Sequence, residues 1–304
     1  MTKREIIPFT TEADWLAHRQ KDVTSTESSA LFGANPWVTP FGLWHAKHGL
    51  SEPVEVTERM ELGTALQDAV AAHIASKRGW KIRRMDEYIR LPDARMGSSF
   101  DYEILALDER GPGLLEIKCV DLFAYQRGWL LDGDEIEAPE RIEIQLQHEL
   151  HVAGYAWGAL GVLVGGNRTE VIERPYFPDV GAAIETKIRA FWAMTEAPVP
   201  NYMDDGELLR RINSIITEGK QVDMKSDADL ASLCERYATL GKAIDSQKKE
   251  RDACYANILA IIGDAEKVLA NGYKISSWRV AEGEVSYHRD AFRSMRITPT
   301  KEKA

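Results

Sequence analysis

The fold is decided by one stretch of the sequence, Gly113-Leu-Leu-Glu-Ile-Lys-Cys-Val120. Such a short and mostly apolar run predicts a strand near the centre of a sheet. Alternate side chains of a strand point to the same face, so Glu116 and Lys118 share one face. Charged side chains in a buried strand cost free energy unless they are paired or bind a metal ion. The stretch is therefore a candidate functional element as well as a core strand.

The strand before it carries the motif Gly97-Ser-Ser-Phe-Asp101, and a hairpin turn is predicted at Asp108–Gly113. This hairpin would bring Asp101 alongside Glu116. Two neighbouring carboxylates repel each other unless a cation lies between them, and Mg²⁺ suits such a pair. The ion could polarise a phosphate and lower the pKa of a bound water, while Lys118 could orient that water or stabilise charge on the phosphate. The same residues also fit an ordinary charge pair on a solvated edge, but their apolar flanks favour the functional interpretation.

Length and composition leave room for a large core. The chain has 304 residues, 44% of them hydrophobic and 28% charged, which is typical of a soluble globular protein. It has no apolar run long enough to span a membrane and no apolar signal core at its N-terminus, so we expect a cytoplasmic protein without a membrane partner. The three cysteines are scattered without Cys-x-x-Cys spacing, which argues against a disulfide framework or a zinc site. Any metal should therefore have oxygen ligands, which favours Mg²⁺, Ca²⁺ or Mn²⁺.

The pattern along the chain predicts an α/β fold, in which a mixed central sheet of about five strands is flanked by helices. Strands are expected over residues 80–91, 96–107, 113–120, 160–165 and 170–177, and helices over 11–19, 40–47, 58–78, 122–131, 139–155 and 179–195. The prolines of Ala197-Pro-Val-Pro-Asn201 indicate a boundary. We therefore expect a core over residues 1–204 and a mostly helical C-terminal extension over 205–304. Its long helix, expected from Ser226 to Ile262, loses its three-four spacing near Lys248, which disfavours a sustained coiled coil.

Several motifs, in the right order over roughly residues 12 to 200, carry a resemblance to a known family. They are Trp15 and Arg19, Val23–Glu27, Gly33–Trp37, Ser99 two residues before Asp101, Glu116-Ile-Lys118-Cys119, and Gln145-Leu-Gln147 followed by Gly154-Tyr155. Together they resemble the PD-(D/E)XK nuclease superfamily and, more closely, the phage lambda exonuclease and YqaJ-type viral recombinase family. The resemblance implies a restriction-endonuclease-like core.

The resemblance also implies roles for individual residues. Asp101 and Glu116 would bind Mg²⁺, or Mn²⁺, together with the backbone carbonyl of Ile117, Lys118 would be the catalytic lysine, and Gln145 would support the site. A second group would hold the terminal 5′-phosphate of DNA: Arg19, Thr26 and Ser99. An arginine with hydroxyl donors is a chemically sensible phosphate pocket, although Thr26 could equally be a helix cap.

Two positions depart from the family pattern. A glutamate is usual in the long first helix, where this chain has Gln67, which can offer an oxygen but no negative charge. The adjacent Asp68 is rotated by about 100° around the helix and is a poor substitute. Where the family places an arginine after the strand, this chain has Ala124, with Arg127 nearby as a possible replacement.

The function expected from the resemblance is metal-dependent digestion of one strand of linear double-stranded DNA, 5′ to 3′, leaving 3′ overhangs for phage-type recombination in a bacterial host cell. A ring-shaped homotrimer and a single-strand annealing protein as partner are implied as well. The net charge of −10 opposes non-specific phosphate binding, so a basic lining would be confined to the ring interior. Candidates for this lining are Arg19, Lys21, Lys47, Arg95 and Arg127. Three alternatives stay open: an endonuclease of the same superfamily, a DNA-binding protein whose catalysis is weakened by Gln67, and a scaffold that acts through its C-terminal arm.

Overall fold

The computed structural model describes residues 3–9, 11–50, 56–105, 109–132, 135–284, 286–288, 293–295 and 297. The chain divides into two compact units, Met1–Leu209 and Arg210–Ala304. The first unit holds both sheets of the core, and the second holds a long helix and a small hairpin. The helix α8 (Gly206–Ile212) contains the boundary between the two units.

The central sheet of the first unit has five strands in the order β11-β10-β7-β6-β3. Its middle strand is β7 (Gly113–Val120), which pairs in parallel with β10 (Trp157–Val164) and antiparallel with β6 (Tyr102–Ile104). The edges are β11 (Arg168–Pro175) and β3 (Ile82–Arg84), both antiparallel to their neighbours. The predicted central position of the Gly113–Val120 strand in a mixed sheet is thus confirmed.

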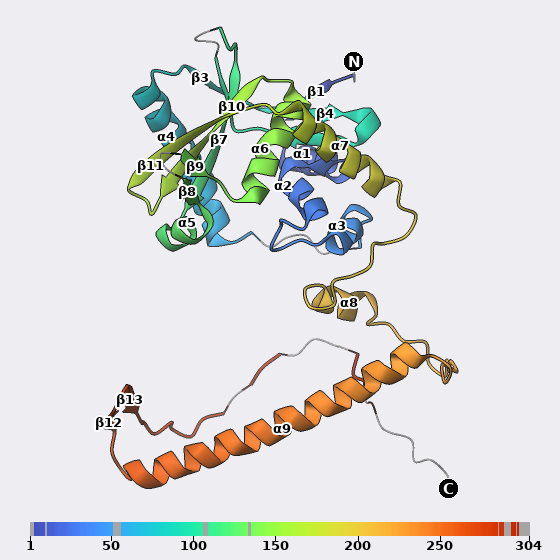
Figure 1. The fold of residues 1–304 in the computed structure, drawn as a ribbon, viewed down its shortest axis with the longest axis vertical. Coiled ribbons are helices and arrows are strands. Elements are labelled where there is room, and N and C mark those ends of the chain that lie inside the picture. Colours follow the sequence, from blue (N-terminus) through green and yellow to red (C-terminus); the bar gives the residue numbers. More distant parts are fainter. Residues whose placement is uncertain are drawn as a thin grey trace. The chain divides into compact units, whose positions relative to one another are not determined.

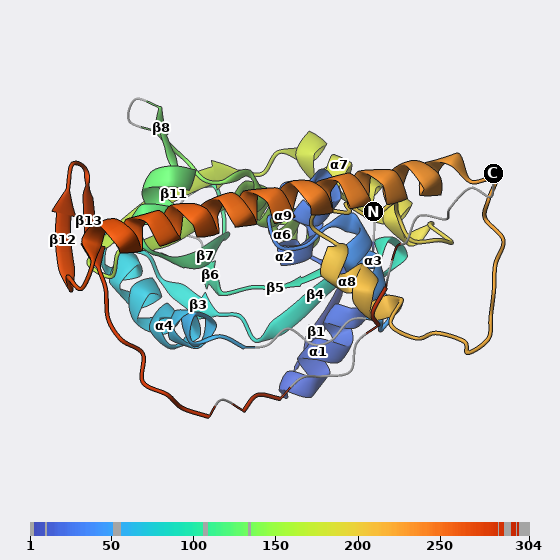
Figure 2. The same cartoon turned by 90° about the horizontal axis from the view of Figure 1, so that it is seen from below.

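A second sheet of four strands was not expected from the sequence. Its order is β1-β4-β5-β2, formed by Glu5–Pro8, Glu87–Leu91, Met96–Ser99 and Val23–Thr24 (Figure 2). Two predicted strands, 80–91 and 96–107, are each broken and contribute one half to each sheet. The breaks lie side by side, because the Met85 amide donates to the Asp101 carbonyl at 3.1 Å. Asp101 therefore lies at the bend between β5 and β6 and not within a strand.

Helices cover both faces of the central sheet (Figure 1). On one face lies α4 (Glu58–Arg78): a Cβ built on Gly161 of β10 would meet side chains of Ile74, Ile117 and Leu115. On the other face lies α6 (Glu140–Ala153), whose Leu146 and Leu150 approach Gly158 of the same strand. Because residues 158 and 161 of a strand face opposite sides, α4 packs on the Ile117 face of β7 and α6 on the Glu116 face. The expected α/β class, with a mixed sheet between helices, is confirmed.

The remaining elements of the first unit are short. Helices α1, α2, α3, α5 and α7 span Glu12–Lys21, Ser25–Ser28, Pro40–Lys47, Leu122–Gly128 and Pro178–Trp192, 3₁₀ turns η1 and η2 span Ser29–Phe32 and Pro92–Ala94, and a hairpin joins β8 (Leu130–Asp132) to β9 (Glu135–Glu137). Thr11 and Thr39 cap α1 and α3 by accepting hydrogen bonds from backbone amides, which is why these helices begin where the sequence predicts. Gly79 ends α4 with a φ of 69°, a left-handed conformation that favours glycine.

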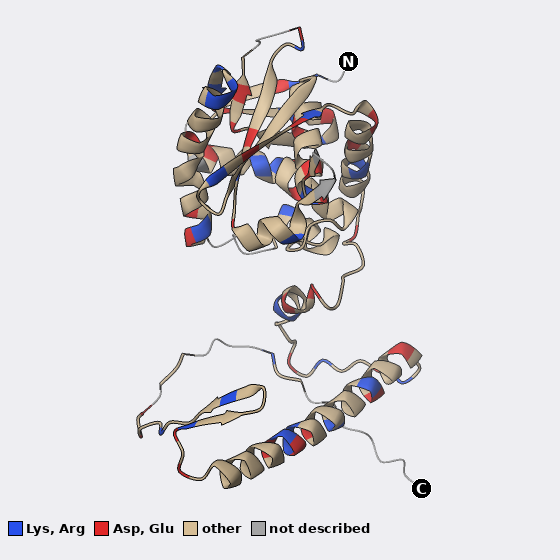
Figure 3. Cartoon of the chain, turned by 60° about the vertical axis from the view of Figure 1, so that its left-hand side comes forward, with Lys and Arg blue, Asp and Glu red and all other residues tan. Residues whose placement is uncertain are grey.

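The second unit is dominated by α9 (Ala228–Ile262), followed by the hairpin of β12 (Lys267–Ala270) and β13 (Tyr273–Ser276). Asp227, not the predicted Ser226, caps α9 by accepting from the Leu230 amide at 2.8 Å. None of its side chains is buried, and basic and acidic residues are interspersed along it (Figure 3). Among the described residues, no helix is both long and apolar enough to cross a membrane.

Candidate active site

Asp101 and Glu116 meet at the centre of the five-stranded sheet. In the β6–β7 pairing Tyr102 lies opposite Leu115, so the next position of each chain brings Asp101 beside Glu116. The Oδ2 atom of Asp101 accepts a hydrogen bond from the Ile117 amide at 2.8 Å. Burial, reinforced by the charge of Glu116, raises the pKa of Asp101 to about 8. The sequence-based expectation that these two carboxyl groups adjoin is therefore met by the geometry.

Lys118 lies on the same face of β7 as Glu116. Its Nζ donates to Glu116 Oε1 at 2.7 Å and to Gln145 Oε1 at 2.9 Å. Burial alone would lower the pKa of the lysine, but the charge and hydrogen bond of Glu116, followed by Asp101, raise it above its ordinary value. Lys118 is therefore a cation at neutral pH, held between groups from a strand and a helix.

The Gln145 amide on α6 links this lysine to two carboxyl groups. Its Nε2 donates to Glu116 Oε1 at 2.7 Å and to Glu149 Oε1 at 2.9 Å, while its Oε1 accepts from Lys118. Because both carboxyl groups accept from the amide nitrogen, they orient the amide and leave its oxygen for the cation. Gln145 is thus a connector between strand β7 and helix α6.

Glu149 is a member of this group that the sequence analysis missed. It is 1% exposed, and burial followed by the charge of Glu116 raises its pKa well above the ordinary value. Its only local signal is the spacing of four residues from Gln145, which places both on one side of α6. That signal is weak without the knowledge that this side of the helix faces Glu116.

Gln67, by contrast, is not joined to the Asp101–Glu116 pair. It lies half-buried on α4, on the opposite face of β7, and its side chain makes no hydrogen bond to another described residue. The neighbouring Asp68 accepts from Arg84 at 2.7 Å and from the Tyr102 hydroxyl, so its carboxylate is already engaged. The interpretation of Asp68 as a poor substitute is consistent with these contacts.

The donor set at the centre of the sheet fits a hard cation with few protein ligands. Within the described ranges no group of three or more His, Cys, Asp or Glu side chains is arranged to hold a metal ion. Mg²⁺, however, commonly binds through one or two carboxylates and keeps several waters. Asp101, Glu116 and the carbonyl of Ile117 supply such a set, and a cation between the two carboxyl groups would relieve the repulsion that raises the pKa of Asp101.

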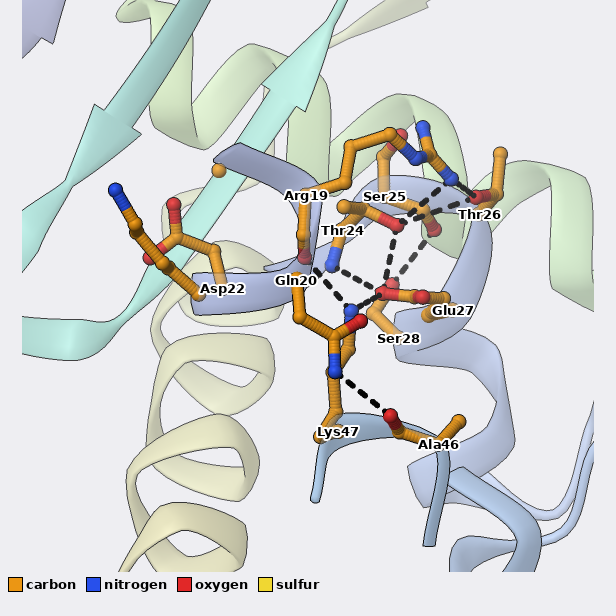
Figure 4. Close-up of polar contacts among 12 residues, drawn as sticks. Arg19, Gln20, Asp22, Thr24, Ser25, Thr26, Glu27, Ser28, Ala46 and Lys47 are labelled. Atoms are coloured by element: carbon orange, nitrogen blue, oxygen red, sulfur yellow. Dashed lines mark hydrogen bonds and ion pairs between the residues drawn. The ribbon is translucent and has the colours of Figure 1, made fainter. Parts of the chain in front are cut away.

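A second polar cluster lies where α1, β2 and α2 meet (Figure 4). One guanidinium nitrogen of Arg19 donates to the hydroxyl oxygens of Thr26 at 3.2 Å and Thr24 at 3.4 Å, and the group stacks 4.6 Å from the centre of the Trp15 ring. Arg19 forms no ion pair with an acidic side chain of the described residues. We call Arg19, Thr24 and Thr26 the Arg19 cluster.

The other predicted phosphate-binding residues lie apart from these hydrogen bonds. Ser99 ends β5, the strand that pairs in parallel with β2, with Thr24 opposite Gly97. It is the neighbouring Ser98 whose hydroxyl donates to Ser25, at 2.7 Å. Arg127 on α5 donates to the Phe123 carbonyl of its own helix at 3.2 Å. The hydrogen bonds therefore bring Arg19 and Thr26 together but join neither of them to Ser99 or Arg127.

Two residues expected to line a DNA channel have other contacts. The Lys47 side chain is only 2% exposed and forms an ion pair with Glu27. Arg95 packs 3.3 Å from the centre of the Trp192 ring and donates to the Lys21 carbonyl at 3.1 Å. The expectation for Lys47 is wrong, because a buried and paired ammonium cannot face bound DNA.

Comparisons with known proteins find a sequence match for the part of the chain that holds the candidate site. Residues 14–156 match the model of the YqaJ-like viral recombinase domain. The uncharacterized protein YqaJ of Bacillus subtilis (strain 168) is 32% identical over 160 residues, which are 51% of this chain and 47% of that protein. The chain thus spans about half the length of the curated relative that it matches. The resemblance expected from the motifs is confirmed.

Solved structures with a similar fold include two exonucleases. The alkaline exonuclease LHK-Exo from Laribacter hongkongensis has a TM-score of 0.47 and 18% identity, covering 66% of this chain and 97% of that one. A phage related exonuclease from Haemophilus somnus 129PT has a TM-score of 0.38 and 11% identity, covering 60% and 85%. The similarity to the YqaJ-like domain rests on the sequence match and not on these distant structures.

Proposed function

Since residues 14–156 match the YqaJ-like viral recombinase domain, we propose that the chain is a metal-dependent DNA exonuclease that digests one strand of a linear duplex from its 5′ end. The observation that carries the proposal is the network in which Lys118 and Gln145 meet Glu116 beside the half-buried Asp101. A lysine and a carboxylate on one strand face, with a second carboxylate beside them, are suited to phosphodiester hydrolysis. The product would be a 3′ overhang for recombination.

Each residue of the network has a distinct task in this proposal. Asp101, Glu116 and the Ile117 carbonyl would hold Mg²⁺ or Mn²⁺, which when bound polarises the phosphate and acidifies a water. The Lys118 ammonium would stabilise the negative charge that builds up on the phosphate oxygens. Gln145 would hold the side chains of Lys118 and Glu116 in fixed positions relative to each other, since its amide contacts both.

The 5′ polarity rests on the Arg19 cluster. A guanidinium without an acidic partner, together with a threonine hydroxyl, can bind the oxygens of a terminal phosphate. Arg19 and Thr26 are accessible for this contact, because Arg19 is half-buried and Thr26 is exposed. We propose that Ser99 and Arg127 contribute further phosphate contacts once DNA is bound.

Two partners belong to the proposal by the family resemblance alone: further copies of the chain in a ring-shaped trimer, and a single-strand annealing protein. A ring would allow a basic interior beside an acidic exterior, which accords with the net charge of −10. Size-exclusion chromatography with light scattering tests the trimer, and a monomer at all concentrations would contradict it.

A digestion assay tests the proposed function. A linear duplex with 5′-phosphate ends and a closed circular duplex are incubated with Mg²⁺ or Mn²⁺. We expect loss of the linear substrate alone, no loss in EDTA, and no loss with an Asp101→Ala variant. Cutting of the circle would identify an endonuclease instead.

One observation favours a second candidate, a DNA-binding protein with weakened catalysis. Gln67 brings no charge and makes no hydrogen bond to the described residues of the metal-binding group. Tight DNA binding without digestion under either metal would support this candidate. In that case a Gln67→Glu variant should gain nuclease activity.

A further inference from the structure

The Arg19 cluster is backed by a buried lysine that the proposed chemistry does not use. Lys47 is the last residue of α3, and its Nζ lies 2.7 Å from Glu27 Oε2 and donates to the Arg19 carbonyl at 2.8 Å (Figure 4). Burying an ammonium costs free energy unless partners replace its water shell. Burial lowers the pKa of Lys47, and the charge of Glu27 opposes this shift. The burial of Lys47 is therefore explained by the groups that its ammonium binds.

The first partner of Lys47 is the end of helix α1. The Arg19 carbonyl belongs to the last turn of α1 (Glu12–Lys21), where backbone carbonyls lack helical partners and attract cations. A second tie joins the same two helices, because Gln20 Nε2 donates to the Ala46 carbonyl at 2.7 Å. The backbone from which the Arg19 side chain extends is thus fastened to α3.

The second partner of Lys47 is the Glu27 carboxylate, which also binds Thr24 of the Arg19 cluster. Glu27 accepts from the Thr24 amide at 2.9 Å, as part of a capping box at the start of α2, and also from the Thr24 hydroxyl at 2.8 Å. Thr26, whose hydroxyl accepts from Arg19, lies between these two residues in the sequence. The Lys47 ammonium therefore fixes both the segment that carries Arg19 and the segment that carries Thr24 and Thr26.

The same ion pair sets the charge of the cluster. An unpaired Glu27 carboxylate next to Thr26 would repel an anion bound there. With Lys47 in place, the charges of Lys47 and Glu27 cancel and leave Arg19 as the net positive charge of the group. A phosphate at Arg19 and Thr26 then meets a cation whose position is fixed before binding.

We propose that Lys47 is a positioning residue for recognition of the terminal 5′-phosphate: it ties α1 to α2 and cancels Glu27, so that Arg19 and Thr26 are held ready for the phosphate. This inference rests on the proposed function, because it assigns a task within that DNA-end site. It predicts an effect on the choice of DNA end and not on the hydrolysis step at Asp101 and Glu116.

The experiment compares duplexes that carry either a 5′-phosphate or a 5′-hydroxyl, digested by the full chain and by Lys47→Met. We expect the preference for 5′-phosphate ends to fall about tenfold, the size of one charge-assisted hydrogen bond, with little change on 5′-hydroxyl ends. Arg174→Met is the matched control. Arg174 likewise holds a carboxylate, Glu143 at 3.1 Å, and a main-chain carbonyl, Ile136 at 2.7 Å, but it has no contact with the Arg19 cluster.

Two further variants guard against a simple loss of folding. Lys47→Met/Glu27→Gln removes the unpaired, partly buried charge of Glu27, so we expect its melting temperature to recover while the preference stays low, since the tie to Arg19 is still missing. Lys47→Arg keeps the cation and should retain most of the preference. A double variant or a Lys47→Met variant with wild-type preference would overturn the proposal and leave Lys47 a purely structural residue.

The outcomes for the proposed function are separate. If the wild type digests neither duplex, the exonuclease proposal fails, and the ratio of its affinities for the two ends still tests Lys47 by the same comparison. A wild type that digests both ends equally would overturn the role of Lys47 while leaving the nuclease centre intact.

Discussion

The folded protein disfavours ionisation of the Asp101 carboxyl group. Burial and the neighbouring Glu116 raise its pKa from 3.8 to about 8. Between pH 3.8 and about pH 8, the folded state keeps a proton on Asp101 that the unfolded state has released. The free energy of unfolding contributed by this group is therefore present below pH 4 and is lost as the pH rises towards 8.

An Asp101→Asn variant should for this reason be more stable than the metal-free wild type at pH 7.5. We expect a gain of at least about 1 kcal/mol, or about 2–4 °C in Tm for a unit of this size. The gain should shrink as the pH falls to 4 and below, where the unfolded wild type also takes up the proton. Thermal unfolding in EDTA across this pH range measures it, and a gain that grows as the pH falls would contradict the assignment.

Metal binding should make the wild type more stable than the Asp101→Asn variant. A divalent cation binds the ionised form of Asp101, so it stabilises the folded wild type and not the asparagine variant. We expect Mg²⁺ or Mn²⁺ to raise the Tm of the wild type at pH 7.5 and to leave the variant nearly unchanged. Equal shifts in both proteins would show that the ion binds elsewhere.

At single residues, the sequence predicts best where one element carries several members of the site. Glu116 and Lys118 are read from one strand, since alternation alone puts them on one face. Glu149 was missed because its role depends on which side of α6 meets β7. Lys47 was misplaced for a similar reason: a lysine at the end of a short helix suggests exposure, and only the tertiary contacts with Glu27 and Arg19 show its burial.

At the scale of elements, helices were predicted more closely than strands. The bounds Glu58–Arg78 of α4 agree because a capping threonine and a glycine end the helix locally. The strands predicted at 80–91 and 96–107 are broken because their halves join different sheets. The alternation of apolar and polar residues continues across each break, so the sequence pattern does not reveal it. The change of sheet places Asp101 at a bend, where its carboxyl can accept the Ile117 amide.

Helix α6 contributes to the core and to the candidate site at once. Its buried Glu149 contacts the Gln145 amide, so a Glu149→Met variant would remove an acceptor while keeping the side-chain volume. We expect unchanged or higher Tm, because a buried acid is replaced by an apolar group, and about tenfold lower activity, because Gln145 is less well oriented. Glu149→Gln, which keeps an acceptor oxygen, should stay close to wild type; equal loss in both variants would show that the charge itself matters.

At the scale of the molecule, the division into two units separates the site from the long helix. All candidate site residues lie in Met1–Leu209, the unit that contains both sheets. A chain ending at Leu209 should therefore fold and keep the proposed nuclease activity on short linear duplexes, within about threefold, since no residue of the centre is removed. Loss of activity with retained folding would assign the C-terminal unit a direct part in DNA digestion.

The most direct test of the central claim follows each strand of one duplex separately. A linear duplex with 5′-phosphate ends and a different fluorophore within each strand is digested in Mg²⁺ by the wild type and by Lys118→Ala. We predict that each strand shortens from its own 5′ end while the 3′-terminal segment of the opposite strand stays intact at that end. We also predict that Lys118→Ala is slower by about 10²–10³-fold. Shortening from 3′ ends would contradict the proposed polarity, and a Lys118→Ala variant as fast as the wild type would contradict the proposed nuclease centre.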